Sequence, residues 1–247
     1  MKFSKHLTPA GRRFHSRTID TSKFKLNHIR TRQKSHHIHW ESVLMLISLT
    51  NKKHKTIVVD SRQGLFAVPE TTNQLFSTLK QKQRVLPPNS FRRIPIQAGI
   101  TEYIPFIFGK LRFAPLKRNK SGDQIWIAAA KVENHENIRS ADETLKVWFK
   151  DCEEPLIIPS SFYFLNSRLS EINQVRSYQM SLRAHISMVL AENANDFYTQ
   201  YQLSKFPNSP LDLILDSNRI AIKEALNHYC ISADEATIEA ILRKSIQ

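Results

Sequence analysis

The chain has 247 residues, of which 41% are apolar, and a formal charge of +14 at pH 7. This is enough apolar material for the core of one large domain or two small ones. The mean hydropathy is −0.38, and every apolar run is far shorter than a membrane span, which excludes a spanning helix. Two cysteines, Cys152 and Cys230, are too few for a disulfide framework or a four-cysteine zinc site. We therefore expect a cytoplasmic protein, with a single disulfide left open.

Residues 1–39 are the most basic part of the chain. They contain ten Lys and Arg, one acid and six of the ten histidines. Because so little apolar material cannot offset the entropy cost of ordering, we expect a flexible basic N-terminal arm that orders on binding a partner. Phe3, Leu7, Ala10 and Phe14 recur at helical spacing, as in a transit peptide. Pro9 interrupts that helix, which favours the arm.

Residues 40–159 are rich in β-strand patterns. Thr71–Gln83 carries a short helical stripe, with Thr72 as its expected cap. Pro105 and Pro115 indicate that the strands containing them lie at an edge or are bent. The expected strands are Val43–Thr50, Thr56–Asp60, Leu65–Val68, Ile100–Phe108, Lys110–Leu116, Gln124–Val132, Thr144–Lys150 and Leu156–Ile158.

The apolar period changes after residue 159. Over 160–192 apolar residues recur in steps of three and four, which predicts a long amphipathic helix capped by Ser160 or Ser161. Two shorter helices are expected at Asn218–Tyr229 and Asp234–Lys244. The predicted fold class is therefore α+β: an antiparallel β-rich central region, a long amphipathic helix and a small C-terminal helical segment. The predicted domains are the arm 1–39, an α+β DNA-binding core 40–192 and the helical segment 193–247.

Positive charge is concentrated in the first half of the chain. Residues 1–120 hold 24 Lys and Arg against 5 acids, a formal +19, whereas residues 121–247 hold 12 against 17, a formal −5. Solubility alone does not require one half of the chain to carry so many mutually repelling positive charges. A polyanionic partner is indicated, and nucleic acid is the leading candidate.

Four basic clusters in the central region predict the nucleic-acid-binding residues. Lys110 and Arg112 lie two apart on a predicted strand, so both side chains are expected on one face, with Leu111 and Phe113 toward the core. A single cluster is typical of a solvated surface, but four clusters with only four acids from Trp40 to Lys120 favour binding. The expected phosphate contacts are Lys80, Lys82, Arg84, Arg92, Arg93, Lys110, Arg112, Lys117, Arg118 and Lys120.

Sequence patterns of catalysis are scarce. The five glycines are scattered and form no phosphate-binding loop. Asp60 and Glu70 end strand-like segments and could hold magnesium as in a nuclease, but no Glu-x-Lys follows at a suitable spacing. We expect both carboxylates to be structural. The chain is therefore predicted to have no enzymatic activity, cofactor or metal.

The best family-like part runs from Gly99 to Ile186. Its segment FGKLRFAPL, from Phe108, precedes a polar turn and the strand DQIWI, and a later strand, VWFKD, leads to LIIPS and a helix. This order resembles the competence transcription factor family (ComK) of Gram-positive bacteria. The stretch Asn134–Asp142 departs from the family pattern, because it has His135 but no Trp. The resemblance implies an activator of DNA-uptake genes that binds A/T-rich boxes as an oligomer through the minor groove.

Taken together, these features predict a sequence-selective, DNA-binding transcriptional activator of competence genes. Its expected partner is double-stranded DNA, with self-association and a regulatory protein as further candidates, and no membrane. An RNA-binding module and a metal-dependent nuclease remain as alternatives. A weaker alternative is a structural protein whose basic face binds an acidic protein.

Overall fold

The computed structural model describes residues 1–15, 18–82, 90–118, 124–138 and 143–190, with residues 219, 234 and 236–238. Side chains are not described for residues 90, 117, 118 and 183–190. The chain divides into two compact units, one of Met1–Phe91 with Glu102–Asn173 and one of Arg92–Thr101 with Gln174–Gln247. Within the described part, no helix has the length and hydropathy of a membrane span.

A seven-stranded sheet forms the centre of the first unit, in the order β2-β5-β4-β3-β8-β7-β6. All its neighbouring strands are antiparallel except β2 and β5. The α+β class predicted from the sequence is confirmed. The strands are β2 (Thr31–Arg32), β3 (Val43–Ser48), β4 (Thr56–Asp60), β5 (Gly64–Val68), β6 (Phe106–Phe108), β7 (Leu111–Arg118) and β8 (Gln124–Ala128).

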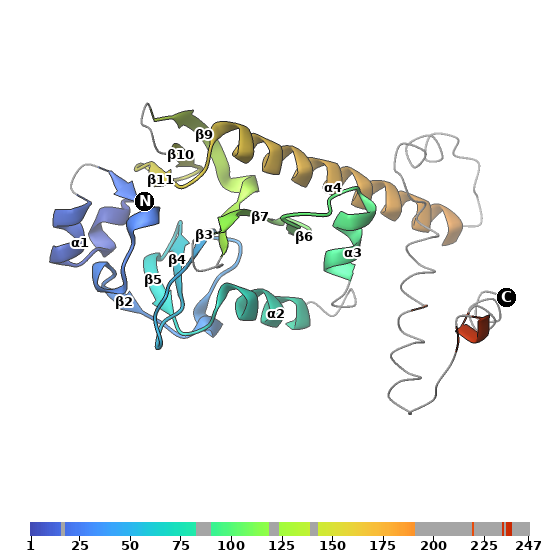
Figure 1. The fold of residues 1–247 in the computed structure, drawn as a ribbon, viewed down its shortest axis with the longest axis horizontal. Coiled ribbons are helices and arrows are strands. Elements are labelled where there is room, and N and C mark those ends of the chain that lie inside the picture. The colour runs from blue at the N-terminus through green and yellow to red at the C-terminus, as the bar shows by residue number, and fades with distance from the viewer. Residues whose placement is uncertain are drawn as a thin grey trace. The chain divides into compact units, whose positions relative to one another are not determined.

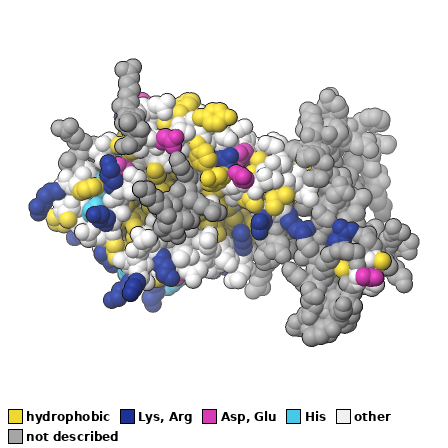
Figure 2. All heavy atoms as spheres, in the orientation of Figure 1, with side chains coloured by type: hydrophobic (Ala, Val, Ile, Leu, Met, Phe, Trp, Pro, Cys, Tyr) yellow, Lys and Arg dark blue, Asp and Glu magenta, His cyan; other side chains and the backbone are white. Residues whose placement is uncertain are grey.

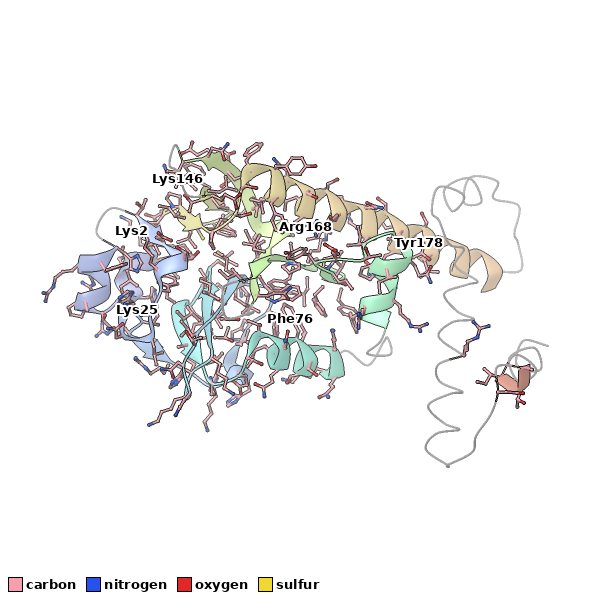
Figure 3. The ribbon with its side chains drawn as sticks, in the orientation of Figure 1. Lys2, Lys25, Phe76, Lys146, Arg168 and Tyr178 are labelled. Carbon is pink, nitrogen blue, oxygen red and sulfur yellow. The ribbon has the colours of Figure 1, made fainter. Side chains whose placement is uncertain are left out.

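Strands β3, β4 and β5 are buried along almost their whole length, because both faces of the sheet are covered. On one face lies α2 (Thr72–Lys82), whose Leu75, Phe76 and Leu79 share an apolar cluster with the sheet. Phe76 extends from α2 into this cluster (Figure 3) and contacts Trp126 of β8 with ring centroids 4.5 Å apart. The cap of α2 is Thr71 rather than the predicted Thr72, because the Gln74 backbone N–H donates to the Thr71 hydroxyl at 3.2 Å.

A second sheet of four strands has the order β1-β11-β10-β9 (Figure 1). The helix α4 (Phe162–Leu190) follows it in the chain. Ser161 caps this helix, since its hydroxyl accepts a hydrogen bond from the Phe164 N–H at 3.2 Å. The strands of this sheet are β1 (Ile19–Asp20), β9 (Val132–Asn137), β10 (Leu145–Phe149) and β11 (Leu156–Ile158).

The N-terminal segment, residues 1–39, differs from the flexible arm expected from its composition. Its strands β1 and β2 each pair with a strand of a different sheet, β11 and β5. Its apolar residues are buried singly between short elements: Phe3, Leu7, Ile19, Phe24, Ile29 and Ile38. These elements are η1 (Phe3–His6), α1 (Pro9–Phe14), η2 (Thr21–Lys23), η3 (Leu26–His28) and η4 (Ser35–His37).

Several predicted boundaries change in the structure. The strand expected over Ile100–Phe108 is reduced to β6, and α3 (Ser90–Gln97) forms where no element was predicted. The strand expected over Gln124–Val132 ends at Ala128, where η5 (Ala129–Lys131) turns the chain into β9. In β7, an irregular register between Pro115 and Arg118 shows the predicted bend, although the strand lies inside the sheet rather than at its edge.

The second unit is described only in part. The side-chain amide of Gln174 on α4 donates to the carbonyl of Ala98, just after α3, at 2.6 Å. Near the C-terminus, residues 236–238 are helical, and Asp234 accepts the Thr237 N–H at 2.8 Å, as expected of a helix cap. The predicted helix Asn218–Tyr229 lies almost wholly outside the described residues.

Candidate nucleic-acid interface

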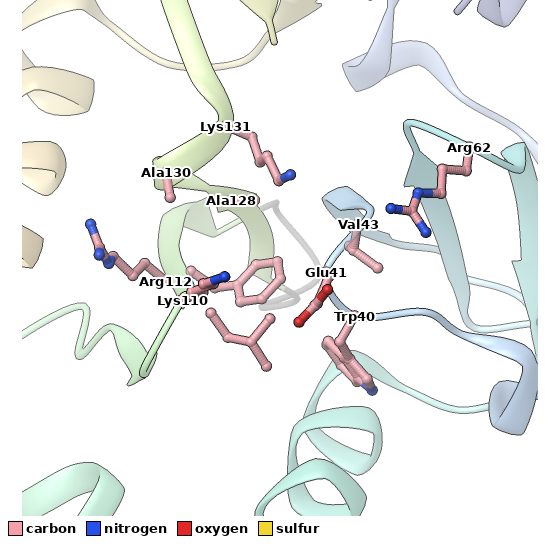
Figure 4. Close-up of a pocket in the computed structure, with 11 residues that line it drawn as sticks. Trp40, Glu41, Val43, Arg62, Lys110, Arg112, Ala128, Ala130 and Lys131 are labelled. Carbon is pink, nitrogen blue, oxygen red and sulfur yellow. The ribbon is translucent and has the colours of Figure 1, made fainter. Parts of the chain in front are cut away.

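Two adjoining hollows in the first unit share Trp40, Glu41, Arg62, Lys110 and Leu111. Their volumes are about 210 Å³ and about 520 Å³. Arg112 and Lys131 line the smaller one, and His39 lines the larger one. We call this site the basic hollow, defined by Trp40, Glu41, Arg62, Lys110, Arg112 and Lys131 (Figure 4).

Trp40 is the aromatic wall of the basic hollow. It lies shortly before β3 and is half-buried. Its ring contacts Phe113 of β7 edge-on, with centroids 5.9 Å apart, and Phe76 of α2, with centroids 5.6 Å apart. These two contacts anchor the indole to the core cluster. Trp40 is therefore a fixed apolar surface beside the charged side chains rather than a mobile one.

Lys110 and Arg112 come from the β6–β7 hairpin. Gly109 has φ +58°, a left-handed conformation that turns the chain there. Lys110 occupies this turn, and β7 begins only at Leu111, so the predicted strand position of Lys110 is corrected. Figure 4 shows the amine of Lys110 toward the hollow and the guanidinium of Arg112 turned away from it. The two cations line one site, but they do not form the single strand face that their spacing predicted.

Arg62 is held by the turn between β4 and β5. The buried carboxylate of Asp60 accepts the backbone N–H groups of Arg62 and Gln63 at 2.7 and 2.8 Å. Its second oxygen accepts the Ser42 hydroxyl at 2.8 Å. Asp60 therefore shapes the turn, as the sequence predicted. Across the described residues, no group of three His, Cys, Asp or Glu side chains could hold a metal ion.

Cationic charge exceeds anionic charge in the basic hollow. Arg62 and Lys110 are exposed and Lys131 is half-buried, and Figure 4 shows the charged ends of these three residues turned toward the hollow. None of the three forms an ion pair with a described carboxylate. Glu41 is the one acidic lining residue among those described. The hollow thus presents uncompensated positive charge to solvent.

The acidic second half of the chain does little to neutralise the basic first half within the described structure. Lys2 and the N-terminal amine pair with Glu153, both at 3.6 Å. Lys23 pairs locally with Asp20 at 3.0 Å. These pairs lie outside the basic hollow and engage none of its lining residues. The positive charge of the hollow is therefore available to an external anion.

The structure does not gather the ten predicted contact residues at one place. Lys110 and Arg112 lie in the basic hollow, while Lys80 and Lys82 end α2, whose Leu79 lines the larger hollow. Arg92 and Arg93 belong to the second unit, on α3. Figure 2 shows Lys and Arg side chains in several separate places on the face it displays. Arg84 and Lys120 lie outside the described residues, as do the side chains of Lys117 and Arg118.

Sequence reasoning missed Trp40, Arg62 and Lys131. It relied on clusters of neighbouring cations, and the two missed cations stand apart from such clusters. The order β5-β4-β3-β8-β7 brings the β4–β5 turn, the start of β3 and the β6–β7 hairpin together. No local signal in the sequence could have indicated this meeting, because the pairing of β3 with β8 joins distant segments.

Comparisons with protein-family models, curated proteins and solved structures give no match for this chain. The fold and the basic hollow define a protein of the α+β class with a hollow on its first unit that is lined mainly by cations among its charged residues.

Proposed function

We propose that this protein binds double-stranded DNA through the basic hollow and regulates transcription without catalysing a reaction. The supporting observation is that Arg62, Lys110 and Lys131 face one hollow beside an anchored tryptophan, with no described carboxylate paired to them. Such unpaired cations attract phosphates and release counterions from DNA when they bind.

The lining residues divide into two physical roles. Arg62, Lys110 and Lys131 supply charge, which gives affinity and orientation but little sequence information. Trp40 offers a rigid apolar surface that can pack against a sugar or an unstacked base. This combination favours a protein that recognises particular DNA sites over one that only neutralises the phosphate charge.

The step from DNA binding to gene activation rests on the resemblance of residues 99–186 to the competence transcription factor family. That resemblance makes A/T-rich promoter boxes the sites to test first. Narrow A/T-rich minor grooves carry an enhanced negative potential that suits inserted Arg and Lys side chains. Self-association and a regulatory protein partner belong to the same proposal.

A charge-matched pair of variants tests the proposal. The triple variant Arg62→Gln, Lys110→Gln, Lys131→Gln removes the inward-facing cations of the hollow. The control triple Lys5→Gln, Arg13→Gln, Lys53→Gln removes three exposed cations elsewhere on the first unit. We expect the hollow variant to lose about a hundred-fold in affinity and about 2 to 3 in salt slope, since each phosphate contact contributes about 0.9. Equal losses in both triples, or binding that does not depend on salt, would contradict the proposal.

Competition between nucleic acids separates this proposal from its alternatives. A/T-rich duplex should displace labelled DNA better than scrambled duplex or structured RNA. Preferential displacement by RNA would replace DNA with RNA as the partner. Magnesium-dependent cleavage abolished by Asp60→Asn, which keeps an acceptor for the turn, would support the nuclease alternative, which the hydrogen bonds of Asp60 to the β4–β5 turn argue against.

A further inference from the structure

Two buried histidines meet in the N-terminal segment. His15 follows α1 and His28 ends η3, and they are only 6% and 5% exposed. The Nε2 atom of His15 lies 3.3 Å from the Nδ1 atom of His28. Gly11 of α1 packs directly on His28, since a Cβ atom there would lie 2.6 Å from the His28 carbonyl oxygen. The two histidines therefore join α1 to η3, and these two elements are in direct contact.

The hydrogen bonds around the pair require both rings to be neutral. The Asp20 N–H donates to Nδ1 of His15 at 3.3 Å, so that nitrogen carries no proton. The Lys25 N–H lies 3.4 Å from Nδ1 of His28 and donates to it, so that nitrogen is also an acceptor. His15 then donates its Nε2 proton to His28. Protonating either Nδ1 would turn an acceptor into a donor facing another donor.

The surroundings also oppose a positive charge. Phe14 lies 5.0 Å from both imidazoles, and Phe24 lies 5.1 Å from His15, measured between ring centroids. Burial lowers the pKa of His15, and so does repulsion from His28 and Lys23, while Asp20 alone raises it. Burial and repulsion from Lys25 lower the pKa of His28. Both rings are thus kept neutral by apolar contacts and nearby cations.

The segment carrying this pair is attached to the sheets by short ladders. β1 pairs with β11 over two residues, and β2 pairs with β5 over two residues. Thr8 reinforces the join between α1 and η3, with its N–H donating to the His28 carbonyl at 2.9 Å. Ser4 binds Glu154 of the first unit through its hydroxyl at 2.7 Å. Met1 and Thr21 add hydrogen bonds to the carbonyls of Asp151 and Ile157. The histidine contact lies within this segment, so its loss would open the join between α1 and η3.

We propose that His15 and His28 form a pH-sensitive latch between α1 and η3, and that their protonation parts these two elements and so loosens the N-terminal segment, residues 1–32. This latch does not depend on the proposed binding of DNA.

The sign of the effect follows from the lowered pKa values. A released histidine titrates near its ordinary pKa of 6.5, whereas the latched pair binds protons only at lower pH. The latch is therefore fully stable above about pH 6.5 and weakens as the pH falls below that value. Where the stability of the latch changes most steeply with pH, each proton taken up shifts the equilibrium between closed and open latch about ten-fold per pH unit.

Hydrogen–deuterium exchange on the full chain tests the latch. Between about pH 7.5 and about pH 5.5, after correction for intrinsic exchange, protection of residues 1–32 should fall at least about ten-fold. Peptides covering β3 and β4 should keep their protection and serve as the internal reference. His28→Asn, whose side-chain oxygen can still accept both hydrogen bonds, should reduce the pH response. The control His135→Asn, on β9, should leave that response unchanged. Unchanged protection of residues 1–32 at the lower pH would overturn the proposal.

A second measurement covers the case in which His28→Asn unfolds the segment at neutral pH. Histidine ring signals of the unmodified protein can be followed through the same pH range by NMR. Midpoints for His15 and His28 below 6.5, with loss of the segment's signals at the same pH, are expected. Midpoints at or above 6.5 would overturn the latch independently of any variant.

Discussion

The hydroxyl of Ser42 donates a hydrogen bond to the buried carboxylate of Asp60 at 2.8 Å, and this contact joins the start of β3 to the β4–β5 turn. Trp40 and Glu41 lie just before Ser42, and Arg62 lies just after Asp60. One carboxylate thus sets the spacing of two walls of the basic hollow. The residue that sequence reasoning weighed as a metal ligand instead holds the hollow in shape.

Asp60→Ala should destabilise the protein by about 2 to 4 kcal/mol. The change leaves the Ser42 hydroxyl and two turn N–H groups, all donating to Asp60, without an acceptor inside the fold. Asp60→Asn keeps an acceptor for the turn and should cost less than half as much. Urea denaturation of both variants measures the difference. Equal stability of Asp60→Ala and the unmodified protein would show that the turn does not depend on this carboxylate.

Trp40 should contribute to DNA binding as a surface rather than as a charge. Trp40→Phe keeps an aromatic ring against Phe76 and Phe113 but shortens the apolar wall of the hollow. We expect about a five- to ten-fold loss of affinity, about 1 kcal/mol, with an unchanged salt slope. Fluorescence titration against a duplex at several salt concentrations measures both quantities. The control is Trp148→Phe, on β10 of the other sheet, which should bind as the unmodified protein does. A lowered salt slope in Trp40→Phe would contradict this role.

Two glycines with left-handed backbones should respond differently to alanine. Gly109 has φ +58° with no atom within 4 Å of an added Cβ, whereas Gly64 has φ +78° and its Cβ would clash with the His6 ring. Gly109→Ala should therefore cost only the conformational penalty of about 1 to 2 kcal/mol. Gly64→Ala should cost more, because His6 must also move. Thermal unfolding compares them, and adding His6→Ala to Gly64→Ala should recover part of the extra cost. Equal costs for both glycines would show that His6 moves freely.

The ion pair of Arg168 with Glu171 on α4 should show an unusual pH dependence. Arg168 also stacks against Tyr103 and Phe164, at 5.3 and 5.0 Å from the ring centroids. Burial raises the pKa of Glu171, against the opposing effects of Arg168 and a hydrogen bond from Ser167. The folded state therefore binds the Glu171 proton more tightly than the unfolded state does. Relative to Glu171→Gln, the unmodified protein should lose stability as the pH rises from about 4.5 through the raised pKa.

Denaturation of the two proteins across that pH range checks this prediction. The control is Glu136→Gln, because Glu136 is exposed and pairs with Lys146 at 3.3 Å. Its stability difference from the unmodified protein should stay flat, since exposed pairs contribute little. A stability difference for Glu171→Gln that grows in favour of the unmodified protein with rising pH would contradict the stated effect of burial.

Secondary structure with a strong local pattern could be read from the sequence. Thr56–Asp60 and Leu156–Ile158 form strands with the predicted bounds, because their runs of apolar and β-branched residues leave few other conformations. The long helix after Ser161 follows from its three- and four-residue steps. Where the pattern is weak, as in Ile100–Phe108 and Ser90–Gln97, tertiary packing decides between strand, helix and loop.

By itself, the sequence determined the α+β class, the division of charge between the two halves, and the cations available for binding. Only the tertiary structure decided which of those cations meet, because Arg62, Lys110 and Lys131 come together through the pairing of strands far apart in the chain. It also decided that the N-terminal segment is ordered. That order comes from single apolar residues buried against two sheets and from a pair of neutral histidines. The sequence could not indicate it, because the strands that hold the segment, β5 and β11, lie far along the chain.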